Sequence, residues 1–272
     1  ANAAVAAARL GLHSALLTNK GDDDIGKEHL RILKREKVST DFVKSHWRQK
    51  SNYHYVLWFK DERTILVRHE KYAYSIPDMG NPKWLYVTSL GPDTLSFHDD
   101  LKNYLAEHKK TKLAFQPGTF QINLGAEKLA YLYERSAVFV CNVEEAQKIL
   151  GIQDSDPGTL LRKMQKLGPD IVLITDGPRG AYVRHKKEVH FMPPYPDPKA
   201  PYERTGAGDA FASTFVSALA LGMTPVEALA WAPINSMSVV QKIGAQEGLQ
   251  RREDLEHLLD KAPKTYRPMM LK

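Results

Sequence analysis

A short glycine-rich segment stands directly before a predicted helix and ends in an acidic residue. It reads Thr205-Gly206-Ala207-Gly208-Asp209. The small side chains of this segment leave its backbone N–H groups accessible, and such groups at a helix N-terminus bind anions. A carboxylate beside an anion site is useful if Asp209 takes the proton of a hydroxyl that attacks a bound phosphoryl group. The segment therefore predicts phosphoryl transfer to an alcohol, and a tight glycine turn capped by Asp209 is the alternative.

The elements that must position this segment alternate between strands and helices. We expect strands at 12–18, 84–88, 112–116, 137–141, 171–175, 181–184 and 189–192, and helices at 26–37, 97–108, 125–135, 143–150, 158–167, 208–221 and 225–243. This alternation favours an α/β fold with a mostly parallel central sheet covered by helices on both faces. Phe211, Ala212, Phe215 and Leu219 form the apolar face of the helix after the glycine segment. Asp209 lies opposite that face, so its carboxylate should point away from the core.

Residues 51–70 depart from the alternation. Two β-rich runs, 52–59 and 64–69, flank the turn 60–63, which is a pattern typical of a hairpin. A two-stranded hairpin does not fit the layers of a parallel sheet. We therefore expect it to form a small β lid near the N-terminus.

Length and composition exclude several classes of protein. The chain has 272 residues, of which 43% are hydrophobic, and no apolar run approaches the ~18 residues of a membrane span. The single cysteine, Cys141, excludes an internal disulfide and a cysteine-rich zinc module. The net charge of +6 suits anionic small molecules such as nucleotides, and the basic tail 261–272 is interpreted as a solvated terminus. We expect one cytoplasmic domain over 1–272 with no nucleic-acid or membrane partner.

The glycine segment and the alanine-rich helix after it resemble the second signature of the PfkB/ribokinase family of carbohydrate and nucleoside kinases. Further segments resemble motifs of that family in the same order: 1–11 the end of its first signature, 21–26 a turn after a strand, 142–145 an Asn-x-x-Glu motif, 175–180 a nucleotide-side glycine turn, and 242–245 a Lys-x-Gly-Ala turn. The resemblance implies a ribokinase-like three-layer α/β/α sandwich. It also implies that an N-terminal strand and a Gly-Gly loop precede residue 1.

The resemblance assigns roles to individual residues. It implies that Asp209 is the catalytic base and that Gly206, Ala207 and Gly208 form the anion hole. The remaining assignments are Asn142 and Glu145 for Mg²⁺ and phosphate oxygens (Glu145 through water), Thr175, Gly177, Gly180 and Asn235 for the nucleotide, and Asn2 for hydroxyls of the acceptor. Structural alternatives exist for some of these: a first-turn helix residue for Glu145, a plain hairpin turn for 175–180, and a buried polar residue for Asn235.

The sequence departs from the family pattern at two places. Glu203-Arg204 replaces the usual Asp-Thr before the glycine segment, and this change puts activation by K⁺ in question. Arg204 either contacts the transferring phosphoryl group as part of the substrate site or is a solvated loop residue. Gln116-Pro117 replaces a commoner Asp/Asn-Pro pair at a strand end, which leaves the role of Gln116 unassigned.

The sequence thus predicts a kinase that uses ATP and Mg²⁺ to phosphorylate a hydroxyl of a sugar, sugar derivative or nucleoside, and a phosphosugar is a further possible acceptor. A homodimer through the lid is an additional hypothesis, because some relatives dimerise through such lids and this lid carries an aromatic face. The competing hypothesis is a catalytically silent sensor or scaffold of the same fold, motivated by Glu203-Arg204 and by the absent upstream segment. Such a protein binds nucleotide or sugar but releases no ADP.

Overall fold

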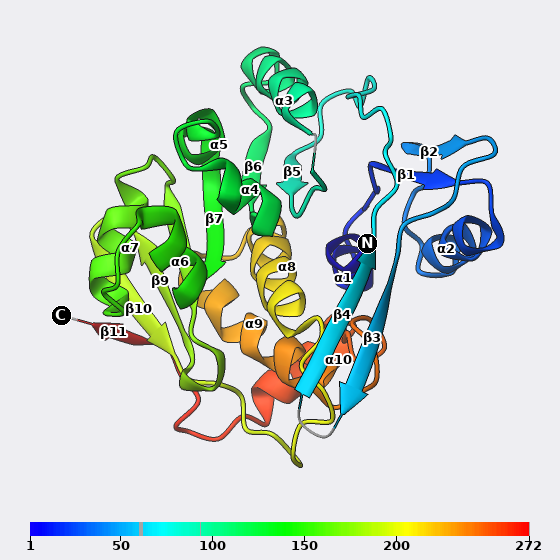
Figure 1. Ribbon diagram of the computed structural model, residues 1–272. Coiled ribbons are helices and arrows are strands. Elements are labelled where there is room, and N and C mark those ends of the chain that lie inside the picture. Colours follow the sequence, from blue (N-terminus) through cyan, green and yellow to red (C-terminus); the bar gives the residue numbers. More distant parts are fainter. Residues whose placement is uncertain (60–61, 93, 272) are drawn as a thin grey trace.

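A seven-stranded sheet lies at the centre of the computed structural model, which describes residues 1–59, 62–92 and 94–271 (Figure 1). Strands β5 to β8 run parallel, and β9, β10 and β11 extend the sheet in antiparallel pairs. The strands in their order across the sheet are β11 (Met269–Leu271), β10 (Glu188–Met192), β9 (Ala181–His185), β8 (Ile171–Thr175), β7 (Ser136–Asn142), β6 (Lys112–Phe115) and β5 (Trp84–Val87). The expected parallel arrangement is therefore present in the central strands.

Helices cover both faces of this sheet, because successive side chains of a buried strand point to opposite sides. In β7, Val138 and Val140 pack into one apolar cluster, whereas Phe139 and Cys141 pack into the other. One face is covered by α3 (Leu95–Glu107), α5 (Ala130–Arg135), α6 (Val143–Leu150) and α7 (Pro157–Gln165), and the other by α8 (Ala207–Ala220), α9 (Pro225–Val240) and α10 (Arg252–Asp260). The predicted three-layer α/β/α fold is confirmed.

The N-terminal segment packs against the beginning of α8. It contains α1 (Asn2–Arg9), β1 (Thr18–Gly21), α2 (Asp24–Arg35) and β2 (Val43–His46), and β1 pairs with β2 in parallel. Val5 and Ala6 of α1 are fully buried in a cluster with Ala210 of α8 and Val239 of α9. This packing brings the first residues of α1 beside the first turn of α8.

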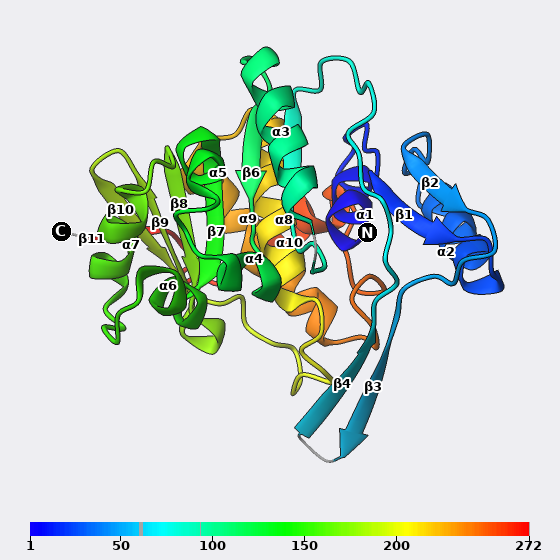
Figure 2. The same cartoon turned by 45° about the horizontal axis from the view of Figure 1, so that its top comes forward.

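The predicted hairpin is present as β3 (Tyr53–Phe59) and β4 (Glu62–Arg68). Of the turn predicted at 60–63, residues 60 and 61 lie outside the described part of the chain. The hairpin forms a two-stranded sheet of its own and extends away from the helices that cover the central sheet (Figure 2). Its middle residues are exposed on both faces, for example Tyr55 at 62% and Ile65 at 43%.

Several predicted elements differ from the structure. The strand predicted at 12–18 is wrong: pairing with β2 begins only at Thr18, and Ala15 makes an isolated bridge to Ser39. The helix predicted at 125–135 begins only at Ala130, as α5. The residues before it form a separate short helix that was not predicted, α4 (Thr119–Leu124), which ends at Gly125 with a φ of +88°. The tail is not simply solvated, since β11 pairs with β10 and the buried Tyr266 donates a hydrogen bond to the carbonyl of Ala230.

Candidate active site

Three polar residues that follow or end neighbouring strands meet at one edge of the central sheet. Gln116 follows β6, Asn142 ends β7, and Thr175 ends β8, with Asn142 and Thr175 paired in register. The carboxyl ends of parallel strands share one edge, which is where open α/β sheets bind their ligands. The N-terminus of α8 reaches the same edge, because the carboxylate of Asp209 accepts a hydrogen bond from Gln116.

Asp209 is held by amide groups from two distant parts of the chain. The Nδ2 of Asn2, on α1, donates to Oδ2 of Asp209 at 2.8 Å. The Nε2 of Gln116 donates to the other carboxylate oxygen, Oδ1, at 3.4 Å. Asp209 is half-buried, whereas the residues that follow it in α8, 210–218, are all buried. The structure thus places two predicted site residues, Asn2 and Asp209, in direct contact.

The two glycines of the glycine segment have different surroundings. Gly206 precedes α8 with a φ of +83°, and a Cβ atom on it would lie 2.4 Å from the Cβ of Ala245. Any larger residue at 206 would therefore be strained by both its backbone conformation and this contact. Gly208 lies inside the first turn, where an added Cβ would meet no atom within 4 Å. Glycine is thus required by the fold at 206 but not at 208.

The first backbone amides of α8 are only partly used within the protein. The N–H of Ala207 donates to the carbonyl of Arg204 over a long 3.3 Å bond. Among the described residues, the N–H groups of Gly208 and Asp209 meet no acceptor. The side chain of Arg204 is exposed beside this turn. The beginning of α8 can therefore offer two N–H groups to an anion, in keeping with the positive end of the helix dipole.

Asn142 and Glu145 form a reciprocal capping box at the start of α6. The N–H of Glu145 donates to Oδ1 of Asn142 at 2.8 Å, and the N–H of Asn142 donates to Oε2 of Glu145 at 2.9 Å. Burial raises the pKa of the Glu145 carboxyl, and the negative charge of Asp209 raises it further. This pair therefore has a structural role, and the carboxylate of Glu145 also interacts electrostatically with that of Asp209.

The residues predicted to bind the nucleotide differ in their surroundings. Thr175 leads into the turn of η1 (Gly177–Arg179), where an added Cβ on Gly177 would meet open space. A Cβ on Gly180 would lie 2.5 Å from the carbonyl oxygen of Met192, so this glycine is required by packing.

Asn235, also predicted to bind the nucleotide, is fully buried in α9. It donates to Oγ1 of Thr214 at 2.8 Å and accepts from the N–H of Gln250 at 2.8 Å. Both polar ends of the Asn235 amide are thus satisfied inside the protein. This placement explains the residue without a ligand, as the alternative for it anticipated.

Residues that the sequence analysis did not assign complete the surroundings of Asp209. The hydroxyl of Tyr86, on β5, donates to Oε1 of Gln116, and Nε2 of Gln246 donates to Oδ1 of Asn2 at 2.9 Å. The only available signal was the position of Gln116 at a strand end, because Tyr86 and Gln246 belong to no recognisable motif. Glu203 accepts a hydrogen bond from the N–H of Gly244, which joins the turn before α8 to the turn after α9.

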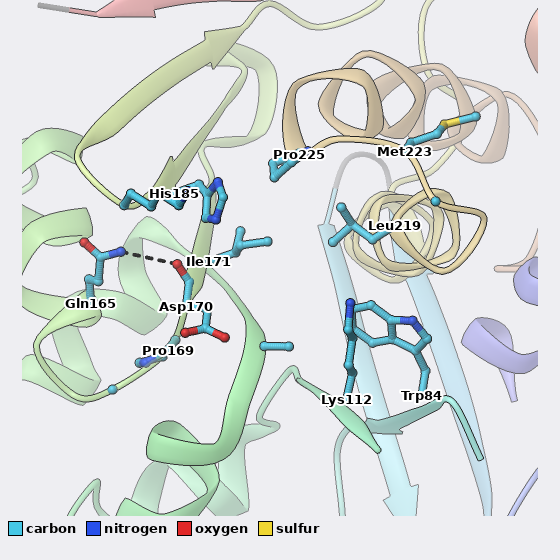
Figure 3. Close-up of a pocket in the computed structure, with 14 residues that line it drawn as sticks. Trp84, Lys112, Gln165, Pro169, Asp170, Ile171, His185, Leu219, Met223 and Pro225 are labelled. Carbon is cyan, nitrogen blue, oxygen red and sulfur yellow. Dashed lines mark hydrogen bonds between the residues drawn. The ribbon is translucent and has the colours of Figure 1, made fainter. Parts of the chain in front are cut away.

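A cavity of about 640 Å³ lies at the opposite edge of the sheet, where the strands begin (Figure 3). Its walls include Trp84 and Lys112 at the starts of β5 and β6, Asp170 before β8, His185 at the end of β9, and Leu219 near the end of α8. None of the predicted site residues lines it. The cavity is therefore separate from the candidate active site.

Two features are absent from the described residues. No helix among them has the length and apolar character that a membrane crossing needs. Within the same ranges, no three His, Cys, Asp or Glu side chains gather closely enough to hold a metal ion.

Comparison with known proteins gives a consistent result. Residues 1–252 match the model of the pfkB family of carbohydrate kinases. The chain is 27% identical over 259 residues to an uncharacterized sugar kinase of Archaeoglobus fulgidus (90% of this chain, 98% of that protein). It is 28% identical over 268 residues to the ribokinase of Bacillus subtilis (95% of this chain, 86% of that protein).

A solved structure shows the same fold. The fructokinase of Vibrio cholerae O395, bound to fructose, ADP and a calcium ion, superposes with a TM-score of 0.79 at 20% identity, over 95% of this chain and 89% of the fructokinase. Ribokinases and fructokinases transfer a phosphoryl group to a hydroxyl group. The family match over nearly the whole chain, together with this fold, leads to one conclusion: the chain belongs to the pfkB family of carbohydrate kinases and is a phosphotransferase that acts on alcohol groups.

Proposed function

We propose that this kinase transfers the γ-phosphate of ATP to a hydroxyl of a sugar, sugar derivative or nucleoside, with Asp209 as the general base. The observation that carries the proposal is the position of the Asp209 carboxylate beside the unengaged N–H groups of Gly208 and Asp209 at the start of α8. A base must lie next to the phosphoryl group whose attacking hydroxyl it deprotonates. The glycine segment provides both groups within one helical turn.

The reaction follows from this placement. The acceptor oxygen forms a bond to the γ-phosphorus while the bond between that phosphorus and the β–γ bridging oxygen breaks. The proton of the acceptor hydroxyl passes to the Asp209 carboxylate, and ADP leaves with the electron pair of the broken bond. The N–H groups of Gly208 and Asp209, and the guanidinium of Arg204, stabilise the negative charge on the migrating group. The N–H of Ala207 contributes once it exchanges its long bond to the Arg204 carbonyl for the phosphate.

Asn142 and Glu145 are the residues that would hold Mg²⁺ in this proposal. Mg²⁺ keeps much of its hydration and commonly takes few protein ligands besides substrate phosphates. The site fits such an ion because the charges of Glu145 and Asp209 repel each other, and a divalent cation would offset that repulsion. When bound, the ion neutralises charge on the ATP phosphates. K⁺ is not part of the proposal, because the Glu203 carboxylate is already used by the N–H of Gly244.

The two sides of the site receive different substrates. We assign the nucleotide to the turn after Thr175, where Gly177 leaves open space, and Gly180 shapes that turn. We assign the acceptor to the side of Asn2, whose amide touches Asp209. The lid borders this side, because the ring of His69 lies 5.7 Å from the ring of Phe120 of α4. Closure of the lid would exclude water and limit the hydrolysis of ATP.

The other face of the lid is proposed to contact a second copy of the chain. Tyr55 and Leu57 share one face of the hairpin with Leu66, and all three are more than half exposed. Val56 and Ile65 occupy the opposite face, which is the side of His54 and its ring neighbour His69. The lid thus has one apolar face for the acceptor side and one for a homodimer. A cytoplasmic location is part of the proposal and is supported by the buried free thiol of Cys141.

The proposal is tested by a screen for ADP release with ATP and Mg²⁺. Sugars, phosphosugars and nucleosides are offered separately to the wild-type protein and to Asp209→Asn. With one class of acceptor, we expect the enzyme to release ADP at a rate far above the rate that it shows without acceptor. The Asn variant should bind ATP but release no ADP. ATP binding without ADP release for every acceptor would instead support the silent sensor.

A further inference from the structure

The surroundings of Asp209 contain a continuous chain of hydrogen bonds in which every donor points toward its carboxylate. The chain runs from Tyr86 to Gln116 to Asp209 on one side, and from Gln246 to Asn2 to Asp209 on the other. It joins β5, the end of β6, the start of α8, the start of α1 and the loop after α9. All five side chains are at least partly shielded from solvent.

The Tyr86 side of the chain fixes the orientation of the Gln116 amide. The Tyr86 hydroxyl donates to Oε1 of Gln116, and an amide oxygen can only accept. The NH₂ group of Gln116 must then face Asp209, where it donates to Oδ1. Burial raises the pKa of the Tyr86 phenol well above its usual range, and the charge of Asp209 adds to this effect. Tyr86 therefore stays protonated and remains a donor.

The Gln246 side repeats the same arrangement. Nε2 of Gln246 donates to Oδ1 of Asn2 at 2.9 Å, so the NH₂ group of Asn2 faces Oδ2 of Asp209. The backbone of Gln246 is itself held in place, because its main-chain carbonyl accepts from a guanidinium NH₂ of Arg9 at 2.9 Å. Each carboxylate oxygen of Asp209 thus has one amide donor whose direction is set by a further residue.

We propose that Tyr86, Gln116 and Gln246 are positioning residues for the phosphoryl transfer, and that together they hold the Asp209 carboxylate in the orientation that accepts the proton. The proposal rests on the role of Asp209 as the base. An ionised carboxylate has about four lone-pair sites, so two amide donors leave two for the acceptor hydroxyl. Holding both oxygens stops rotation of the carboxylate, which matters because small misplacements of a reacting group slow a reaction strongly.

The two hydrogen bonds that reach Asp209 differ in length. The bond from Asn2 is 2.8 Å long, whereas the bond from Gln116 is 3.4 Å. Catalytic hydrogen bonds are commonly long before substrates bind and shorten in the complex. We therefore assign to Gln116 the part of the positioning that tightens with the substrates, and to Tyr86 the maintenance of its direction. This makes Gln116 and Tyr86 one functional unit, which a double-mutant cycle can measure.

The test measures kcat and both KM values for Gln116→Leu, Tyr86→Phe and the double variant. We expect Gln116→Leu to lower kcat by ~10- to 100-fold, with KM for ATP within ~2-fold, because the lost contact acts on the reacting carboxylate. Tyr86→Phe should lower kcat by a smaller factor, roughly 3- to 10-fold, as it acts through Gln116. The double variant should be no slower than Gln116→Leu. If the two single losses of kcat multiply in the double variant, the assignment of Tyr86 is overturned.

A matched control and a conservative variant complete the test. Gln165 accepts a 2.6 Å hydrogen bond from Arg184 at the other edge of the sheet, so Gln165→Leu removes a comparable bond and should leave kcat unchanged. If Gln116→Leu does not fold, Gln116→Glu keeps the shape and the acceptor of Tyr86 but replaces the donor by a second carboxylate. The acid limb of its kcat profile should then move up by about one pH unit.

The outcomes separate this proposal from the proposed function. If Asp209→Asn is active, Asp209 is not the base, and the positioning proposal fails with the proposed function. An inactive Asp209→Asn variant together with full kcat in Gln116→Leu would overturn only the positioning role. A loss of kcat in both variants supports the positioning role, provided that Gln116→Leu unfolds at a temperature close to that of the wild type.

Discussion

Asn2 and Asp209 are 207 positions apart in the chain and are joined by a hydrogen bond of 2.8 Å. The bond exists because α1 packs against α8 through Val5, Ala6 and Ala210, which aligns the first turns of the two helices. An amide that touches the proposed base can also donate to or accept from a neighbouring hydroxyl of the acceptor. The contact therefore brings the N-terminal segment of the chain into the reaction site.

Asp209→Asn should abolish turnover while it preserves the fold. The Asn amide fills the same space but cannot take a proton, so we expect kcat to fall by at least ~10²- to 10⁴-fold. ATP binding measured by calorimetry should change only a few-fold, because the free N–H groups of α8 remain. Weak ATP binding together with normal turnover would contradict the assignment of Asp209 as the base.

The two glycines of the glycine segment should respond in opposite ways to alanine. Gly208→Ala places a methyl group in open space within a helix, so we expect the free energy of unfolding to rise by up to about 1 kcal/mol. The same methyl group stands where phosphate should bind, so KM for ATP should increase, and a β-branched residue should increase it more. Gly206→Ala should lower the melting temperature instead, because of its φ of +83° and its contact with Ala245. Unchanged ATP binding in Gly208→Ala would contradict the proposed phosphate site.

Glu145→Gln should separate the capping role of Glu145 from its charge. The Gln side chain still accepts from the N–H of Asn142, so the start of α6 is retained. Because the pKa of Glu145 is raised in the folded protein, the wild type loses stability as pH rises from about 4.5 through that raised value. The variant lacks this loss and should be the more stable form above that range, with no difference below it. Its activity should need more Mg²⁺, which a titration of rate against Mg²⁺ measures.

K⁺ should have no specific effect on the rate. The carboxylate of Glu203, just before the glycine segment, accepts from the N–H of Gly244. Replacing KCl by NaCl at constant ionic strength should leave kcat unchanged. A marked rise in kcat with K⁺ alone would show that the carboxylate exchanges this bond for an ion.

The exposed hairpin face should determine the oligomeric state. A charge on Leu57 or Leu66 would disrupt an apolar contact between two copies, so Leu57→Asp should give a monomer in sedimentation if the wild type is a dimer. The control is Ile65→Asp, on the opposite face of the same hairpin. A wild type that sediments as a monomer at all concentrations would rule out the proposed homodimer.

The features that could be predicted are those that depend on residues close together in the sequence. The glycine segment before α8, the first-turn position of Glu145 in α6, and the parallel strands with apolar runs follow from short stretches of sequence. The strand at Thr18 was misplaced because its pairing with β2 depends on a partner 25 residues away, not on its own polar residues. Tyr86 and Gln246 were missed for a similar reason. Their meaning depends on which side chains the tertiary fold brings near them.

Arg9 joins α1, α2 and the loop that carries Gln246. Its Nε pairs with the shielded carboxylate of Glu36 at 2.8 Å, and one of its NH₂ groups donates to the carbonyls of Gln246 and Leu249. A change at Glu36, at the far end of α2, would thus be transmitted through Arg9, Gln246 and Asn2 to the proposed base. We therefore expect substitutions at this remote position to change the speed of the enzyme while every group proposed to touch the sugar or the nucleotide stays the same.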